Sequence, residues 1–458
     1  MTVDPSSDLH HLFNPRSIAV VGASNKPGKM GNLFMRRLAA EFRGALYAVN
    51  PSENEVAGVV AHRSVEELPD GIDLLISLVP AASLIMLVES CRKFQVRFLL
   101  AIPSGFAEVS SEGGAVQRRL ASAARDRGMR VVGPNIVGVM NGVIGLNASM
   151  MPELPPGGRG LSCLTQSGGF GMALSMYALD HDVRVAKFCD LGNNSDLDVH
   201  EVLGHFAEDP DTRVVGLFLE SIRNPAAFLH ALEKTAVSKP VILTPVGVTS
   251  AGRRASLAHL GISEGMAQLE HELPKNIIRA DTGLDLLHCA KALMWQRRAR
   301  GHRVAILTGT GGIGAEITDL ALGSGMEVPG FSARLIERLR EHLPYYASVQ
   351  NPVDCTPIWW DYHKIYPLVL DALSESGEVD LVIVSVTDVA ATLPELAAAI
   401  AGWAHHARPI PIVVYWGARH RDFENMKIIE RAAVPCYRST RETVRAAAAL
   451  FESSDLAN

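Results

Sequence analysis

The sequence lacks any long uninterrupted run of apolar residues. No stretch reaches the roughly 18 to 20 residues needed to span a bilayer, although 48% of the 458 residues are hydrophobic. The first residues, MTVDPSSDLHHLFNPRS, also lack the apolar segment of a secretory signal. We therefore expect a soluble, cytoplasmic protein with no membrane partner.

Cysteine is sparse and shows no ligand spacing. The six cysteines are scattered without a C-x-x-C pair, which argues against a disulfide framework and a zinc site. Cys163 and Cys189 lie in apolar strand patterns, so we interpret them as buried packing residues. Two pairs of adjacent histidines have no acidic or thiol partner at ligand spacing, and neighbouring residues do not share a helix face. We expect no metal site.

An excess of basic charge is also missing. The formal net charge is −6, and acidic and basic residues are interspersed along the chain. There is no long basic run and no stripe of alternating aromatic and basic residues, which are the features that nucleic-acid-binding proteins need. We therefore do not expect a nucleic-acid partner.

What the sequence does contain is one pattern three times: an apolar strand, a glycine-rich loop and a helix. The three copies are SIAVVGASNKPGKMGNLFMRRLAAEF, GLSCLTQSGGFGMALSMYALDH and RVAILTGTGGIGAEITDLALGSG. Short continuous apolar runs such as LLISLVP and VDLVIVSV alternate with helical segments between them. Continuous apolar strands separated by helices are typical of parallel sheets covered on both faces. The pattern predicts an α/β protein with three Rossmann-like or flavodoxin-like parallel-sheet domains.

Two segments are the best candidates for domain boundaries. Met151 to Gly160 is rich in Pro and Gly, and Gln296 to His302 is a charged segment after a long helical pattern. We therefore predict domains at residues 1–150, 151–299 and 300–458, each close to the usual domain size.

The first glycine loop, GASNKPGKMG, predicts a phosphate-bearing ligand. Backbone N–H groups at the start of a helix, together with the positive end of the helix dipole, favour phosphate oxygens. Basic and hydroxyl side chains in the loop suit extra phosphate. The candidate binding residues here are Gly22, Ser24, Lys26, Lys29 and Gly31.

Residues after neighbouring strands complete this candidate site. Ligands of doubly wound sheets bind at the carboxyl ends of the strands, where we place Asn50, Val79, Pro80 and Ile102. A nicotinamide dinucleotide would need an acidic side chain near the end of the second strand. The Asn50-Pro51 pair and the elongated loop therefore disfavour a nicotinamide oxidoreductase.

Five motifs, taken in order, resemble the CoA-binding domain of the ADP-forming acyl-CoA synthetases, relatives of succinyl-CoA synthetase. They are VVGAS, VNP, LVP, SGFAE and GPNIVG. The resemblance continues through a phosphohistidine domain, in the motifs LTQSGGFG, DLGNNSDLD, VVGLFLESI and AHLGISEG. It extends to a third, flavodoxin-like domain, in AILTGTGGIG and ASVQNPVDCT. Each motif is weak alone, but their order and spacing are specific to this superfamily.

The resemblance implies a phosphoryl relay. It makes His259 the phosphorylated residue and Glu220 the carboxylate that orients its ring. The phosphate-binding residues that it implies are Ser167, Gly168, Gly169 and Gly261. A histidine suits the relay because neutral imidazole is nucleophilic near pH 7. Gly261 and its small neighbours would let a loop move the ring between two sites.

The same resemblance implies the ligands and partner. We expect coenzyme A as acyl-CoA, phosphate and a small carboxylic acid on this alpha-type chain. Fused members continue into an ATP-grasp unit, for which these 458 residues hold no candidate. We therefore expect a separate ATP-grasp beta subunit that binds ADP or ATP with Mg²⁺, and a hetero-oligomer.

The relay segment departs from the family pattern in two places. The usual S-H-T-G is Ala258-His259-Leu260-Gly261 here, which lacks two hydroxyls, and a usual K-x-G-R segment is replaced by Thr244 to Val248. Arg253 and Arg254 could replace the missing cations. A catalytically silent CoA-binding homologue with a regulatory or scaffolding role is the alternative.

Overall fold

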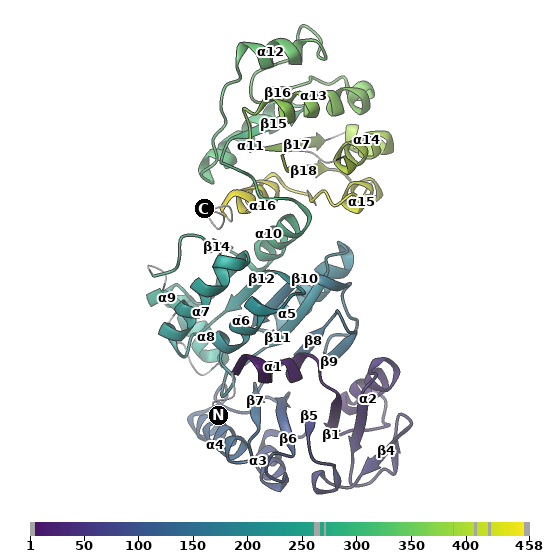
Figure 1. Cartoon of the computed structure of the whole chain (residues 1–458), viewed down its shortest axis with the longest axis vertical. Helices are drawn as coiled ribbons and strands as arrows, with labels where there is room; N and C mark the ends of the chain where they lie inside the picture. Colours follow the sequence, from purple (N-terminus) through teal and green to yellow (C-terminus); the bar gives the residue numbers. More distant parts are fainter. Residues whose placement is uncertain are drawn as a thin grey trace. The chain divides into compact units, whose positions relative to one another are not determined.

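Three largely parallel β-sheets, flanked by helices, organise the chain, as predicted. The computed structural model describes residues 5–260, 266–269, 272–387, 389–406, 410–419 and 423–452. These residues fall into two compact units, 1–275 and 276–458, of which the first contains two sheets. No helix in the described part of the chain is long and apolar enough to cross a membrane. The predicted α/β class is therefore confirmed (Figure 1).

The first sheet has the strand order β3-β4-β2-β1-β5-β6-β7, and only the β3–β4 pair is antiparallel. β5 is buried along its whole length, because helices cover both faces and select continuous apolar strands. The strands are β1 Ser17–Val21, β2 Ala45–Val49, β3 Glu55–Val56, β4 Val59–His62, β5 Ile72–Ser77, β6 Val96–Ala101 and β7 Arg130–Val132.

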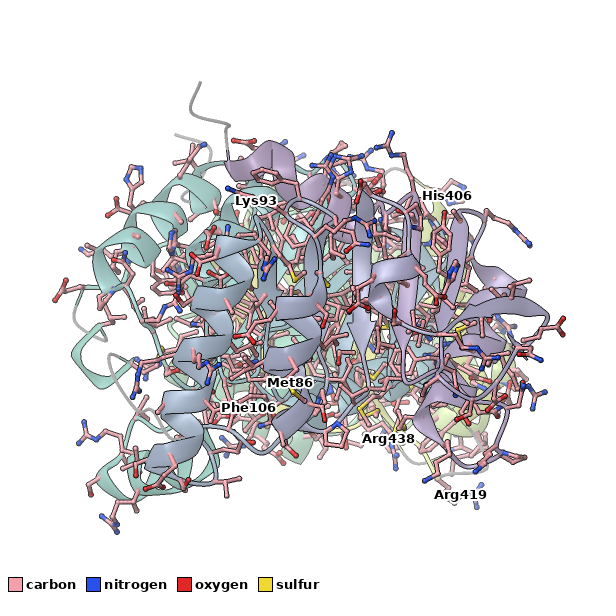
Figure 2. The ribbon with its side chains drawn as sticks, turned by 90° about the horizontal axis from the view of Figure 1, so that it is seen from below. Met86, Lys93, Phe106, His406, Arg419 and Arg438 are labelled. Atoms are coloured by element: carbon pink, nitrogen blue, oxygen red, sulfur yellow. The ribbon has the colours of Figure 1, made fainter. Side chains whose placement is uncertain are left out.

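The helices of this region are α1 Pro5–Phe13, α2 Met30–Glu41, α3 Ala81–Ser90 and α4 Ser111–Asp126, with a short 3-10 turn at Val65–Glu67. One apolar core joins the sheet to α3 and α4. In Figure 2, Met86 belongs to the exposed surface of α3, at 63% exposed, whereas Phe106 is buried in the turn before α4. α1 packs against α6, Val199–Glu208, a helix beside the second sheet.

The second sheet runs in the order β13-β12-β10-β11-β8-β9 within the first unit. Its strands are β8 Gly138–Asn141, β9 Leu146–Ser149, β10 Gly157–Thr165, β11 Val185–Asp190, β12 Thr212–Leu219 and β13 Val241–Pro245. Its helices are α5 Gly168–Asp180, α6 Val199–Glu208, α7 Pro225–Ser238, α8 Ser250–Leu260 and α9 Met266–Leu269. The hairpin β8–β9 comes from residues 138–149 and pairs antiparallel with β11. The ranges 1–150, 151–299 and 300–458 stay a prediction of domain organisation.

The second unit contains a third sheet, entirely parallel, in the order β16-β15-β17-β18-β19. The strands of this unit are β14 Ile278–Arg279, β15 Val304–Thr308, β16 Val353–Asp354, β17 Leu381–Thr387, β18 Ile412–Gly417 and β19 Cys436–Tyr437. Its helices are α10 Gly283–Trp295, α11 Gly311–Gly323, α12 Ala333–Arg340, α13 Tyr362–Ser376, α14 Pro394–His405, α15 Phe423–Arg431 and α16 Thr440–Glu452, with 3-10 turns at Trp359–Asp361 and Ala390–Thr392.

All six cysteines are buried free thiols. Burial raises the pKa of the Cys91 thiol to about 11, and it raises the pKa values of Cys163 and Cys189 above the usual range for a thiol. A thiol that stays protonated is a poor nucleophile. The interpretation of Cys163 and Cys189 as packing residues is confirmed.

Candidate functional site

The first glycine loop turns sharply after β1 and brings the start of α2 back against it. Gly22 has a φ of +88°, a conformation that residues with a side chain rarely adopt. At Gly31 a Cβ would lie 2.0 Å from the carbonyl oxygen of Gly22, so only glycine fits. Residues 25–29 of the loop between them are exposed. The structure therefore holds Gly22 and Gly31 in the close approach expected of a helix-start ligand site.

Asn50 ties this loop to the turn after β2. Its Nδ2 donates to the carbonyl of Ala23 at 2.7 Å, and its Oδ1 accepts from the N–H of Ser52 and of Glu53 at 2.7 and 3.0 Å. Both ends of the amide are thus used within the protein. Asn50 shapes the predicted site through these bonds.

A carboxylate does lie near the end of β2, contrary to the reasoning from sequence. Glu53 accepts from the backbone N–H of Asn25 at 3.1 Å and also from the Asn25 side chain. The hydroxyl of Ser24 lies 3.5 Å from the same carboxylate and accepts from the N–H of Lys26 at 3.1 Å. Glu53 was missed because it follows Asn50 by three residues, in a turn instead of at the strand end.

The other predicted residues lie at the same sheet edge. The N–H of Leu78 donates to the carbonyl of Val21 at 3.0 Å, which places Val79 and Pro80 beside the start of the glycine loop. Ile102 follows β6, which pairs in parallel with β5. The carboxyl ends of adjacent strands are therefore followed by Gly22, Val79, Pro80 and Ile102, which lie at one edge of the sheet.

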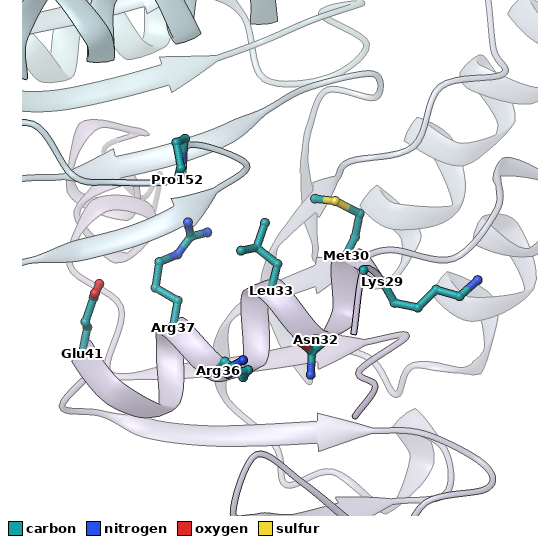
Figure 3. Close-up of a pocket in the computed structure, with 9 residues that line it drawn as sticks. Lys29, Met30, Asn32, Leu33, Arg36, Arg37, Glu41 and Pro152 are labelled. Atoms are coloured by element: carbon teal, nitrogen blue, oxygen red, sulfur yellow. The ribbon is translucent and has the colours of Figure 1, made fainter. Parts of the chain in front are cut away.

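A cavity of about 530 Å³ adjoins the end of the glycine loop. Figure 3 shows Met30, Leu33 and Arg37 projecting from α2 toward Pro152. Arg37 donates to the backbone carbonyls of Ser149 and Met151, and burial lowers the pKa of its guanidinium. The residues that line the cavity are Gly28, Lys29, Met30, Asn32, Leu33, Arg36, Arg37, Glu41 and Pro152. Of the two predicted lysines, Lys29 lines the cavity and Lys26 does not.

The second glycine turn starts α5. Ser167 is the N-cap residue, and its Oγ accepts from the N–H of Phe170 at 3.4 Å. Its backbone N–H is bound by Thr165 Oγ1 at 2.9 Å. Gly168 fits closely, because a Cβ there would lie 2.5 Å from Cγ1 of Val137, whereas Gly169 is exposed. The turn therefore combines a helix cap with an exposed helix start, where anions bind.

Glu220 follows β12 directly and is 8% exposed. Its backbone N–H and that of Ser221 donate to Oε1 of Gln166 at 2.8 and 2.9 Å. Gln166 immediately precedes Ser167. The structure therefore brings Glu220 and the α5 turn together through one buried side chain that the sequence reasoning did not single out.

His259 lies in the last turn of α8, so the part of the predicted AHLGISEG loop from Ala258 to Leu260 is helical instead. Thr249 caps this helix, since Gly252 N–H donates to its Oγ1 at 3.0 Å, and Ala, Leu and Arg are good helix formers. The side chain of His259 and the whole of Gly261 lie outside the described residues. Arg253 and Arg254 are exposed, and Arg254 donates to the carbonyl of Ser250 within its own helix.

Two of the quoted motifs join the two sheets of the first unit. Asp190 accepts from the N–H of Val137 at 2.7 Å and from that of Gly192 at 3.0 Å. Asp196 accepts from the N–H of Val131 at 2.9 Å and forms an ion pair with Arg130 at 3.0 Å. These buried carboxylates tie DLGNNSDLD to the segment around GPNIVG.

Glu108, from the SGFAE motif, belongs to the same junction. Its carboxylate accepts from Asn193 Nδ2 and Gly105 N–H, each at 2.5 Å. Although partial burial acts to raise it, these hydrogen bonds leave the pKa of Glu108 below its usual value. The sequence patterns SGFAE and DLGNNSDLD did not predict that their carboxylates join the two sheets. In the described part of the chain, no three His, Cys, Asp or Glu side chains converge as a metal site would require.

Comparison with known families agrees with this geometry. The family described as CoA binding domain matches residues 16–142, and the family described as succinyl-CoA ligase like flavodoxin domain matches residues 158–293.

Individual relatives match over most of the chain. The alpha subunit of ADP-forming acetate–CoA ligase II from Pyrococcus furiosus is 31% identical over 454 residues, covering 97% of this chain and 98% of the relative. ADP-forming acetate–CoA ligase I from Archaeoglobus fulgidus is 32% identical over 385 residues, covering 83% and 55%. A solved dinucleotide-forming acetyl-coenzyme A synthetase 1 from Ca. Korarchaeum cryptofilum, in complex with phosphate and ADP, has 29% identity and a TM-score of 0.88 over 98% of this chain and 97% of that chain. The resemblance is thus confirmed: the chain belongs to the family of the alpha subunits of ADP-forming acetate–CoA ligases.

Proposed function

We propose that this chain is the alpha subunit of an ADP-forming acyl-CoA synthetase. It interconverts acyl-CoA, phosphate and ADP with the free acid, CoA and ATP. In this proposal residues 1–150 bind CoA, residues 151–299 carry the phosphohistidine, and residues 300–458 form a third flavodoxin-like domain of the ligase-CoA type.

One connection carries the proposal. Asn135 donates its N–H to the carbonyl of Pro103, next to Ile102, at 3.0 Å. Two residues on, Val137 packs against Gly168 at the start of α5 and donates to Asp190. The candidate CoA edge and the candidate phosphate turn are therefore linked by a few residues of one segment. A thioester held at the first edge would have its carbonyl carbon close to a phosphate bound at the second.

The chemistry then proceeds in three transfers. A phosphate oxygen attacks the thioester carbonyl carbon, the C–S bond breaks, and CoA leaves as a thiol after taking a proton. A ring nitrogen of His259 attacks the phosphorus of the acyl phosphate, the P–O bond to the acyl group breaks, and a carboxylate leaves. The phosphoryl group then passes from His259 to ADP and regenerates the imidazole.

Each proposed residue has a part in these steps. The amides of the Ser167–Gly169 turn and the Ser167 hydroxyl stabilise the transferred phosphoryl group. The carboxylate of Glu220 accepts from the second ring nitrogen of His259, which fixes the tautomer and stabilises the developing positive charge. Gly22, Gly31 and the strand ends hold the nucleotide part of CoA.

A partner subunit completes the proposed reaction. Relatives that match this chain from end to end are named as alpha subunits, which supports a second subunit. We assign to it the ATP-grasp fold and the binding of ADP or ATP with Mg²⁺. The assembly would then be a hetero-oligomer, and the phosphorylated His259 would deliver its group to the nucleotide on that partner.

Phosphorylation of the chain tests the proposal. The purified chain is incubated with acetyl-CoA and inorganic phosphate, and an acid-labile, phosphate-sized addition is sought by intact mass. We expect this addition in the wild type and its loss in His259→Asn. Other acyl-CoA thioesters extend the test to different acyl groups.

The altered Ala258-His259-Leu260 segment and the absent K-x-G-R segment favour a second candidate, a silent CoA-binding homologue. The same experiment separates the two. Measurable CoA binding without any phosphate addition, for every acyl-CoA tried, would establish the silent homologue and overturn the relay.

A further inference from the structure

Gln166 is a buried polar side chain that the relay described above does not use. It is 1% exposed and lies between β10 and the Ser167 cap of α5. A buried amide is stable only if its polar atoms find partners. The identity of those partners therefore indicates what Gln166 does.

All of its side-chain hydrogen bonds go to the end of β12. Oε1 accepts from the N–H groups of Glu220 and Ser221 at 2.8 and 2.9 Å, and Nε2 donates to Ser221 Oγ at 3.3 Å. The backbone N–H of Gln166 also donates to the carbonyl of Phe218 at 3.3 Å. One residue thus holds the backbone on both sides of the Glu220 peptide.

The neighbours of Gln166 in sequence explain why this matters. The next residue, Ser167, caps α5, and the preceding Thr165 binds the Ser167 N–H through its hydroxyl. The backbone that presents the phosphate turn and the backbone that presents Glu220 are consequently fixed to each other by this side-chain amide, in addition to the pairing of β10 with β12. A displacement of about 1 Å between catalytic groups can lower a rate by about 100-fold.

We infer that Gln166 is a positioning residue that sets the Glu220 carboxylate relative to the Ser167–Gly169 turn. Its role is indirect, because its side chain binds the backbone N–H groups of Glu220 and Ser221. This inference rests on the proposed relay and adds to it the residue that couples its two fixed parts.

The test compares rates of phosphohistidine formation from acetyl-CoA and inorganic phosphate. Gln166→Met keeps the side-chain length but removes all three hydrogen bonds, and we expect a rate about 30- to 100-fold below wild type. The KM for acetyl-CoA should stay unchanged, because the candidate CoA residues lie at another sheet edge. Gln166→Asn, one methylene shorter, serves as a second variant if the methionine variant does not fold.

Gln95 offers a matched control. It is also fully buried, and its side chain makes three bonds to backbone groups: Nε2 to the carbonyls of Val65 and Leu68, each at 3.0 Å, and Oε1 from Arg92 N–H at 2.9 Å. Gln95→Met should destabilise the fold similarly but leave the rate within about twofold. An equal loss of rate in both variants would reduce Gln166 to a structural residue.

A double-mutant cycle separates action through Glu220 from a general effect. In a Glu220→Gln background, Gln166→Met should change the remaining rate by less than about threefold, because the group that it positions is already gone. A full additional loss there, or an undiminished rate in Gln166→Met alone, would overturn the inference and leave the relay standing. A wild type that takes no phosphoryl group would overturn both.

Discussion

The turns that begin α5 and α11 have the same backbone design but different supports. In each, a threonine at the end of a strand binds the N–H of the N-cap residue two positions on: Thr165 to Ser167 at 2.9 Å and Thr308 to Thr310 at 3.1 Å. Each neighbouring strand ends in an aspartate that binds a backbone N–H two residues further, Asp190 at 3.0 Å and Asp354 at 2.8 Å.

The differences lie in what surrounds the turns. Ser167 caps its helix through its side chain, whereas Thr310 makes no such bond. The residue between threonine and cap is Gln166 in the first turn and Gly309 in the second, where a Cβ would lie 1.8 Å from the hydroxyl of Tyr362. One strand–turn–helix design thus occurs with and without a side chain that binds the backbone of a neighbouring glutamate, Glu220. The supports, and not the glycines, distinguish the proposed catalytic turn.

The largest effect is expected at Glu220, whose backbone N–H is bound by Gln166 beside the α5 turn. Glu220→Gln should slow phosphohistidine formation by about 100-fold or more, since it removes the charge that would orient and stabilise the imidazole. Glu316→Gln on α11, where Thr440 binds the carboxylate, is the control and should change the rate by less than about threefold. Equal losses, followed by intact mass over time, would erase the distinction between the two turns.

The second-largest expected effect is a loss of stability caused by a steric clash at Gly168. Gly168→Ala would place a Cβ 2.5 Å from Cγ1 of Val137, a stiff β-branched side chain, and should cost about 1 to 3 kcal/mol of stability in urea unfolding. Gly312→Ala, at the second residue of α11, meets no atom within 4 Å and should cost nothing measurable. A Gly168→Ala variant as stable as the wild type would mean that Val137 can move away from the start of α5.

The caps provide a smaller contrast. Ser167→Ala removes the side-chain cap of α5 and should lower the free energy of unfolding by about 1 kcal/mol. Thr310→Ala removes no cap bond from α11 and should change it by less than about 0.5 kcal/mol. Both values come from urea unfolding of the purified chains, and a reversed order would contradict the assignment of the caps.

The smallest expected effect is electrostatic and concerns the contribution of His200, in the first turn of α6, to stability. The carboxylate of Asp198, 3.5 Å from Nδ1 of His200, raises the pKa of this imidazole, and partial burial and Arg223 oppose the shift less strongly. Because its pKa is raised in the folded state, the protonated imidazole stabilises the fold fully at pH values below the unfolded-state pKa of about 6.5. This stabilisation is lost as the pH rises through the folded-state pKa. The free energy of unfolding of the wild type, measured in urea, should therefore exceed that of His200→Gln by less than about 1 kcal/mol at pH 5.5. At pH 9 the two values should be equal. A difference that grows toward high pH would refute the pairing.

The sequence predicted the elements well and their long-range connections poorly. Apolar strands, glycine loops and helices give local signals, so the three sheets and the turns at Gly22 and Ser167 could be predicted. The hairpin at residues 138–149 joins β11 because of hydrogen bonds that no local pattern encodes. Gln166 was missed for the same reason, since its partners lie more than 50 residues away.

Local propensity explains the error at the relay segment. Small residues around His259 suggested a loop, but Thr249 and the following Ala, Arg and Leu residues support a helix that continues to Leu260. Glu53 was overlooked because the rule for dinucleotide binders looks for an acid at the end of the strand and not in the turn beyond it.

The carboxylates that join the first two sheets constrain how members of this family can be recombined. Asp190 and Asp196 are buried and bind backbone N–H groups of the other segment, Val137 and Val131. A chimera that takes its first domain from one relative and its second from another would keep these backbone bonds but could lose Arg130, the partner of Asp196. A chimera of two relatives should therefore fold best when the segment around GPNIVG and the segment DLGNNSDLD come from the same relative.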